Sequence, residues 1–339
     1  MTGTFTQRCK ALIVELGLGQ ADDVIGVTPL TGGVASDIAM VELPNRKICV
    51  KFALAKLKVA ADWHAPVHRN AAEYAWLKVA AELRPSSAVR LFGRSQAQHG
   101  FAMEFLNGED VYLWKTALLE EADDRGEAAE VADMIGRIHA ASAQAAFDTS
   151  QFQNRDDFYA LRIEPYLTYT ASIHPDLGPQ LNELATTLYE SQQVLVHGDV
   201  SSKNILFRDN GPIVLDAECA TMGDASFDPS FCLNHLVLKA AHLHRSRSRL
   251  LDGVGHFWRA YAPHVHWEPA SELESRICRL LPMLMLARID GKSPVEYLDE
   301  HTRANVRKTA IGLIRDPSQN LDDFVARLAK DLEDRNDCN

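Results

Sequence analysis

The sequence predicts an α+β fold with strands concentrated before Asn107 and helices after it. Short apolar segments bounded by turn residues recur in the first part, and apolar residues at helical spacing recur in the second. A chain of 339 residues, 46% of them hydrophobic, can form two hydrophobic cores. We therefore expect an N-terminal lobe with an antiparallel sheet and a helix, followed by a larger, mainly helical lobe.

The N-terminal elements follow from hydrophobic patterning. The segments with strand-like patterns are 24–27, 38–43, 48–53, 89–92 and 101–106. One of them contains Lys51 within an apolar run, and a buried lysine needs a charged partner. Helical spacing over 67–83 predicts a helix that carries two candidate partners, Glu73 and Glu82.

The remaining elements are mostly helices. Helical patterns cover 111–119, 127–143, 157–172, 180–191, 231–244, 246–261 and 271–289, with two more helices after Glu300. Pro165 should kink or divide the third of these helices, because proline cannot donate a backbone hydrogen bond. Asp228 precedes Pro229 and is predicted to be the N-cap of a helix that starts there.

One polar motif interrupts the helical part. Residues 195–218 read LVHGDVSSKNILFRDNGPIVLDAE, and apolar runs flank a loop that contains Asp199 and Asn204. A turn at 209–211 and a second apolar run then lead to Asp216. Phosphoryl transfer needs a group that receives a hydroxyl proton and oxygen ligands for Mg²⁺, and this spacing of Asp, Asn and Asp supplies both.

The motif closely resembles that of the aminoglycoside phosphotransferase and choline kinase family, whose members have a two-lobed, protein-kinase-like fold and phosphorylate small-molecule hydroxyls. The resemblance implies that Asp199 is the catalytic base, that Asn204 and Asp216 are Mg²⁺ ligands and that His197 supports the loop. ATP is the expected donor, with GTP possible. Ala217 departs from the family pattern, in which a bulkier residue is usual.

The same resemblance assigns roles upstream. It implies a nucleotide-binding lobe at 1–106 and a catalytic and acceptor-binding lobe at 107–339. It favours Glu73 over Glu82 as the partner of Lys51. The expected nucleotide contacts are Gly32, Gly33 and Ser36 in a phosphate-covering loop, Lys51 on the phosphates, and the backbone of Glu104 to Leu106 on the base.

Several roles stay open from the sequence. Lys203 could contact the γ-phosphate or be an exposed lysine without a role, and Glu218 could assist the metal or pair with a cation. Three C-terminal aromatic residues suit either helix packing or an acceptor wall, namely Trp258, Tyr261 and Trp267. The acceptor could be an amino sugar, aminoglycoside, sugar or amino alcohol.

Composition and motif context limit the alternatives. A net charge of −11 argues against a nucleic-acid partner, and no apolar run approaches the ~18 residues of a membrane span, so we expect a soluble, cytoplasmic protein. The six cysteines lack metal-site spacing and should be reduced. Gly198 replaces the arginine of protein kinases, which favours a small acceptor. A nucleotide-binding pseudokinase with a scaffold role is the alternative, and the oligomeric state is not predicted.

Overall fold

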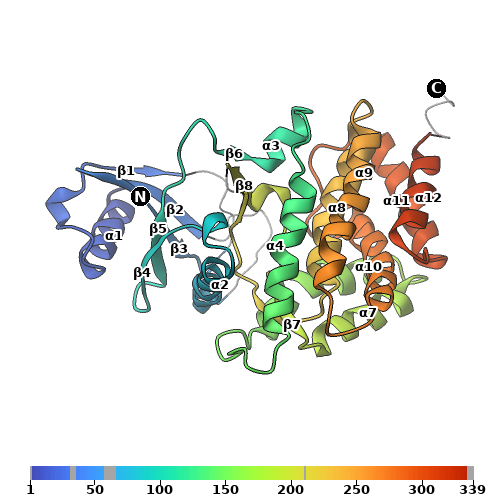
Figure 1. Ribbon diagram of the computed structural model, residues 1–339, viewed down its shortest axis with the longest axis horizontal. Helices are drawn as coiled ribbons and strands as arrows, with labels where there is room; N and C mark the ends of the chain where they lie inside the picture. Colours follow the sequence, from blue (N-terminus) through green and yellow to red (C-terminus); the bar gives the residue numbers. More distant parts are fainter. Residues whose placement is uncertain (1, 31–35, 57–65, 210, 334–339) are drawn as a thin grey trace.

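The computed structural model describes residues 2–30, 36–56, 66–209 and 211–333. An antiparallel sheet forms one end of the molecule and helices form the other, with α1 and α12 at opposite ends (Figure 1). The sheet has the strand order β1-β2-β3-β5-β4. Its strands are β1 (Gly26–Pro29), β2 (Ser36–Leu43), β3 (Arg46–Ala53), β4 (Leu91–Ser95) and β5 (Gly100–Glu104).

The two faces of this sheet have different neighbours. Helix α1 (Thr2–Glu15), which the patterning did not predict, packs its Leu12 and other apolar side chains into a core with Phe52. Helix α2 (Asn70–Leu83) contributes Trp76 to a second core that continues into the helical lobe. Phe52 faces the α1 side, and its neighbour Lys51 pairs with Glu73 of α2, so Lys51 lies on the face that looks toward the helices.

The second part of the chain is built around a central helix, α8 (Phe227–His242), in which every residue from Phe227 to Ala241 is buried. The other longer helices are α3 (Trp114–Leu119), α4 (Glu127–Ser142), α7 (Gly178–Glu190), α9 (Arg247–Tyr261), α10 (Ala270–Asp290), α11 (Glu300–Arg315) and α12 (Leu321–Glu333). Three-residue 3₁₀ turns lie at Ala21–Asp23, Val67–Arg69, Pro85–Ser87, Ser202–Asn204 and Ala262–His264. No helix among the described residues is both long and apolar enough to cross a membrane.

Two predicted helices differ in the structure. The segment 111–119 begins as a short strand, β6 (Tyr112–Leu113), because Tyr112 pairs with Phe207 of strand β8 (Ile205–Arg208). The segment 157–172 is divided into α5 (Arg155–Phe158), a π-helix η4 (Tyr159–Thr168) and α6 (Tyr169–Ile173). Pro165 lies inside the π-helix, whose wider turns accommodate a residue that cannot donate a backbone hydrogen bond.

Candidate active site

Short strands hold the polar motif in place. Strand β7 (Val194–Val196) pairs with β10 (Thr221–Gly223), and β8 (Ile205–Arg208) forms a hairpin with β9 (Gly211–Val214). The Leu215 N–H donates to the Asn204 carbonyl over 2.9 Å, which extends this hairpin to the end of the loop 197–204, the predicted catalytic loop. The strands therefore fix both ends of the loop and the approach to Asp216.

Asp199, Asn204 and Asp216 line one cavity of about 650 Å³ between the sheet and the helices. Lys51, Glu73 and the Glu104–Leu106 segment line the same cavity. Its apolar lining includes Leu30, Ile38, Val89, Met103, Leu113, Leu206 and Leu215. The structure thus brings together the described residues of the predicted nucleotide, metal and catalytic sets, apart from Ser36.

The segment predicted to contact the base, Glu104 to Leu106, departs from the expectation drawn from the sequence. The Glu104 N–H already donates to the Arg90 carbonyl over 2.8 Å, and the Glu104 carboxylate pairs with Arg208 at 3.1 Å. Leu106 lies beyond the end of β5, so it is not part of the strand predicted for 101–106. The backbone N–H of Glu104 is therefore already paired and is not available to a bound base.

Lys51 is the centre of a carboxylate cluster. Its Nζ lies 2.8 Å from Glu73 and 3.3 Å from Glu218, and it also forms an ion pair with Asp216. Glu82 is exposed, so Glu73 is the helix partner. Burial alone would lower the pKa of Lys51, but the surrounding carboxylates raise it well above its ordinary value.

Glu218 connects this cluster to the N-terminal part of the chain. Its Oε2 accepts from Nε of the fully buried Arg69 over 2.7 Å, and its Oε1 accepts from the Ser36 hydroxyl. Ser36 therefore contacts Glu218, while Gly32 and Gly33 lie outside the described residues. Arg69 could not be identified from the sequence, because its partner is 149 positions away.

Asp216 has an unusual backbone conformation. Its φ is +72°, in the left-handed region that non-glycine residues rarely adopt. The Asp216 N–H donates to Glu73 over 3.2 Å, so the residue that pairs with Lys51 also holds this conformation. Such strained residues cluster at functional sites, where the surrounding structure compensates for their cost.

Asp228 braces the catalytic loop from helix α8. Its two carboxylate oxygens accept from the backbone N–H groups of His197 (2.7 Å) and Gly198 (2.9 Å). The prediction of an N-cap was wrong, because α8 begins at Phe227 and Ser226 is its N-cap. Gly198 is required there, since its φ is +81° and an added Cβ would lie 2.8 Å from the Cβ of Cys219.

Aromatic and imidazole groups pack beneath the loop. The Asp199 N–H donates to Nδ1 of His197 over 3.0 Å, and burial lowers the pKa of His197, which favours the neutral ring. His139 bonds both Asp228 (3.3 Å) and the Tyr261 hydroxyl (2.7 Å). Tyr261 is fully buried, and neither it nor Trp258 nor Trp267 lines the cavity, which favours packing over an acceptor wall.

Two cations approach the Asp199 carboxylate. Arg162 of the π-helix lies 3.0 Å away through Nη2 and also donates to the Gly198 carbonyl, and Lys203 lies 3.5 Å away. Burial would raise the pKa of Asp199, but Lys203 and Arg162 outweigh it and hold the pKa below its ordinary value. Asp199 is therefore ionised and oriented. Arg162 was not identified from the sequence, since it lies in a different element from Asp199.

The donor set suits a hard divalent cation. Ligand atoms of Glu73, Asp216 and Glu218 lie within 4.8 Å of one another, and Asp216 faces the cavity. The Asn204 Nδ2 donates to the Asp199 carbonyl over 3.2 Å, which leaves the amide oxygen to act as a ligand. Mg²⁺ prefers such oxygen ligands, so Asn204 and Asp216 fit a magnesium site, whereas Glu73 and Glu218 are already paired with Lys51.

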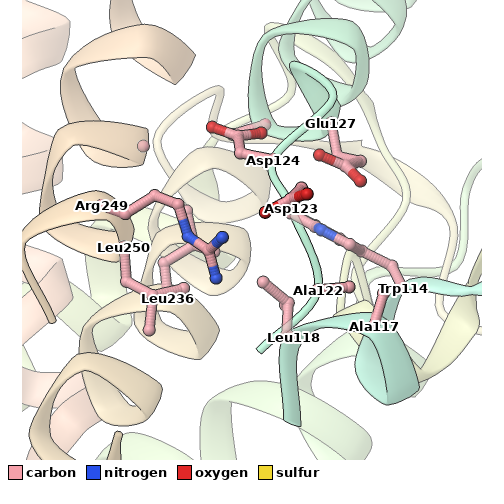
Figure 2. A pocket seen from close by; sticks show the side chains of 12 residues that line it. Trp114, Ala117, Leu118, Ala122, Asp123, Asp124, Glu127, Leu236, Arg249 and Leu250 are labelled. Atoms are coloured by element: carbon pink, nitrogen blue, oxygen red, sulfur yellow. The ribbon is translucent and has the colours of Figure 1, made fainter. Parts of the chain in front are cut away.

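A second hollow lies away from this site, between α3, α4, α8 and α9 (Figure 2). Its volume is only about 30 Å³, and the Arg249 guanidinium extends into it toward Asp123 and Asp124. Glu127, the first residue of α4, accepts from the Tyr112 hydroxyl over 3.0 Å. The acidic side chains therefore lie at the start of α4 and in the segment just before it, and the hollow beside them is too small to hold a metabolite.

Solved structures share the fold at low identity. A choline/ethanolamine kinase family protein from Mesorhizobium loti has a TM-score of 0.55 at 14% identity, with 96% of this chain and 98% of the other covered. An amicoumacin kinase in complex with AMP-PNP, Ca²⁺ and Ami has a TM-score of 0.54 at 13% identity, with coverages of 94% and 97%. The choline kinase of Streptococcus pneumoniae has a TM-score of 0.51 at 14% identity, with coverages of 92% and 99%.

These similarities confirm the protein-kinase-like fold that the sequence predicted, with a sheet-based lobe and a mainly helical lobe. No protein with curated annotation matches the chain. The family model described as the phosphotransferase enzyme family matches residues 26–273, which is more than half of the sequence. The chain therefore belongs to the phosphotransferase enzyme family.

Proposed function

We propose that the protein transfers the γ-phosphoryl group of ATP to a hydroxyl of a small molecule in a Mg²⁺-dependent reaction. The observation that carries this proposal is the single cavity lined by Asp199, Asn204, Asp216 and the Lys51–Glu73 ion pair. Its volume of about 650 Å³ lies in the range of small-molecule sites. Binding of AMP-PNP by the structurally similar amicoumacin kinase supports ATP as the donor, with GTP as the other candidate.

Each residue has a role that follows from its position. Lys51, held by Glu73, would contact the α- and β-phosphates, and the segment from Glu104 to Leu106 would bind the base. Asn204 and Asp216 would hold Mg²⁺, which would neutralise the negative charge of the phosphates.

Asp199 would orient the acceptor hydroxyl and receive its proton. A carboxylate whose pKa is held low is a weak base, so the proton would transfer late, after most of the bond to the leaving oxygen has broken. A loose transition state has this order of events, and positioning and electrostatics then supply most of the rate enhancement. The backbone contacts from Asp228 would keep the loop in this geometry.

The substitution Asp199→Asn tests the assignment. It should lower kcat by about 10³-fold while MgATP affinity stays within about twofold, because it removes the proton acceptor and leaves the nucleotide contacts. Phosphate transfer and equilibrium nucleotide binding are the two measurements. Asp316→Asn is the matched control, because that side chain is 85% exposed and far from the cavity lining. A pseudokinase scaffold would bind MgATP without Mg²⁺-dependent turnover of any acceptor, which would contradict the proposal.

A further inference from the structure

The helical end of the cavity has an unusual charge distribution. Beyond the catalytic loop, its charged lining consists of Lys115, Lys239, Arg288 and Glu296. Glu296 pairs with Lys115 at 3.2 Å, and its side chain is 73% exposed. Neither Lys239 nor Arg288 forms an ion pair with a carboxylate within the described part of the chain, and Glu296 is the one nearby carboxylate against these positive charges.

Lys239 is buried on the central helix α8 and is only 1% exposed. Its Nζ contacts neutral groups: the Ser202 hydroxyl at 3.1 Å, the His235 carbonyl at 3.4 Å and the Tyr297 ring, whose centroid is 5.5 Å away. Burying an ammonium without a counter-ion costs several kcal/mol. A packed apolar residue would remove that cost, so the lysine needs a reason other than stability.

Arg288 of α10 presents further donors at the same end. Its Nη1 donates to the Ser293 carbonyl and, over 2.7 Å, to the Ser293 hydroxyl. Its Nε is buried without a hydrogen-bond partner in the described structure, and the same holds for the Tyr297 hydroxyl. Arg288 and Tyr297 line the cavity, but these two buried atoms do not face it, so the contribution of Arg288 to the cavity is the positive charge of its guanidinium.

The position of this cluster relates it to the reaction. Ser202, which bonds Lys239, lies in the catalytic loop between Asp199 and Asn204. A small molecule held by Lys239 and Arg288 would therefore lie next to the carboxylate that receives the hydroxyl proton. A cationic amino alcohol or aminoglycoside would instead place an ammonium beside two unpaired positive charges.

We infer that the acceptor carries an anionic group, a carboxylate or a phosphate, which Lys239 and Arg288 bind while its hydroxyl faces Asp199. This inference rests on the proposed phosphotransferase function. Arginine binds carboxylates and phosphates through paired hydrogen bonds, and a buried lysine adds a point charge. Burial, with Lys115 and Arg288 nearby, lowers the pKa of Lys239 to about 7, so a bound anion would also keep this amine protonated.

The test compares acceptors of similar size that differ in charge, at saturating MgATP. The panel contains glycerate and gluconate as carboxylates, glycerol 3-phosphate as a phosphate, glycerol and glucose as neutral compounds, and choline, ethanolamine and kanamycin as cations. We expect kcat/KM for at least one anion to exceed that of every neutral or cationic compound by about 10-fold or more. The carboxylate and phosphate arms show which anionic group is recognised.

The variants Lys239→Met and Arg288→Gln assign the effect to these residues. Each should raise the acceptor KM by about 10-fold or more, because removing one partner of a buried charge pair costs at least that much, while MgATP affinity changes less than about twofold. The matched controls are Lys308→Met and Arg315→Gln, both on exposed positions of α11. They should leave every acceptor KM unchanged.

Other outcomes separate the inference from the proposed function. Preferred turnover of a cation, undiminished in Lys239→Met, would overturn the anionic acceptor and retain the phosphotransferase. Absence of both MgATP binding and transfer would overturn the function itself. If MgATP binds and no compound is phosphorylated, calorimetric titration of the anions onto the MgADP complex decides: no binding, or binding unaffected by Arg288→Gln, contradicts the inference.

Discussion

The two ends of the cavity each contain a buried lysine, and the two lysines have opposite surroundings. Lys51 is 3% exposed and has three carboxylates around it, whereas Lys239 is 1% exposed and contacts only neutral groups. Burial lowers the pKa of both, but the carboxylates reverse this effect at Lys51 alone. Two lysines with similar burial thus differ in their partners: the Lys51 ammonium is held by three carboxylates, and the Lys239 ammonium forms no ion pair among the described residues.

The difference indicates what each end is built to bind. At the Lys51 end, negative side chains exceed the cations that contact them, which suits a divalent metal between protein and phosphates. At the Lys239 end, positive charge exceeds negative charge, which suits an anion. The cavity is therefore electrostatically asymmetric, with Asp199 on the loop between the two ends.

Removing the Lys51 ammonium should have the largest effect on both activity and stability. Lys51→Met leaves Glu73, Asp216 and Glu218 together without their shared cation. We expect kcat/KM to fall by about 10²–10³-fold, and the free energy of unfolding to fall by about 3–5 kcal/mol, as when a buried pair loses one partner. Steady-state kinetics and urea unfolding measure the two. Unchanged stability would contradict the view that Lys51 neutralises this cluster.

The Lys51 end was also the easier one to predict from the sequence. Lys51, Asp199, Asn204 and Asp216 lie in or beside short apolar runs, so local pattern and spacing place them on strands and loops. The antiparallel sheet and the helical lobe follow from the same periodicities. Local information is sufficient where a functional residue interrupts a regular hydrophobic pattern.

Contacts between distant segments were beyond that information. Asp228 and Pro229 have the local pattern of an N-cap, but the carboxylate bonds a loop 30 residues earlier. Arg162 lies on a π-helix within a segment that the sequence predicted as an α-helix kinked or divided at Pro165. The sequence pattern places Lys239 on a helix, but only the packing of the folded chain shows that its side chain is buried. Each of these roles depends on which elements meet, and periodicity does not report that.

Removing the Lys239 ammonium should change stability in the opposite direction. Lys239→Met replaces a buried, unpaired charge with an apolar side chain of similar length, and we expect the free energy of unfolding at pH 7 to rise by about 1–4 kcal/mol. Urea unfolding of the acceptor-free protein at pH 6.5 and pH 9 is the measurement. Destabilisation of the variant at pH 6.5 would show that the ammonium has a counter-charge after all.

The pH dependence of that gain has a definite sign. The pKa of Lys239 is about 7 in the folded protein against an ordinary value of 10.5, so between these values the unfolded state binds more protons. The penalty is therefore full below pH 7 and decreases as the pH rises toward 10.5. The gain from Lys239→Met should accordingly shrink at pH 9. Lys51, whose pKa is raised, should show no such change over this range.

A smaller effect is expected at Asp199, whose charge is balanced from two sides. Arg162→Gln removes a guanidinium 3.0 Å from the carboxylate, so burial should raise the pKa of Asp199 and move the acidic limb of kcat toward higher pH. We expect kcat at pH 7 to fall about 10-fold through lost orientation. Lys203→Met should shift the limb in the same direction, because Lys203 lies 3.5 Å from the carboxylate and also holds its pKa down. The absence of a shift in Arg162→Gln would mean that Arg162 supports the Gly198 backbone alone and that the carboxylate is held by other contacts.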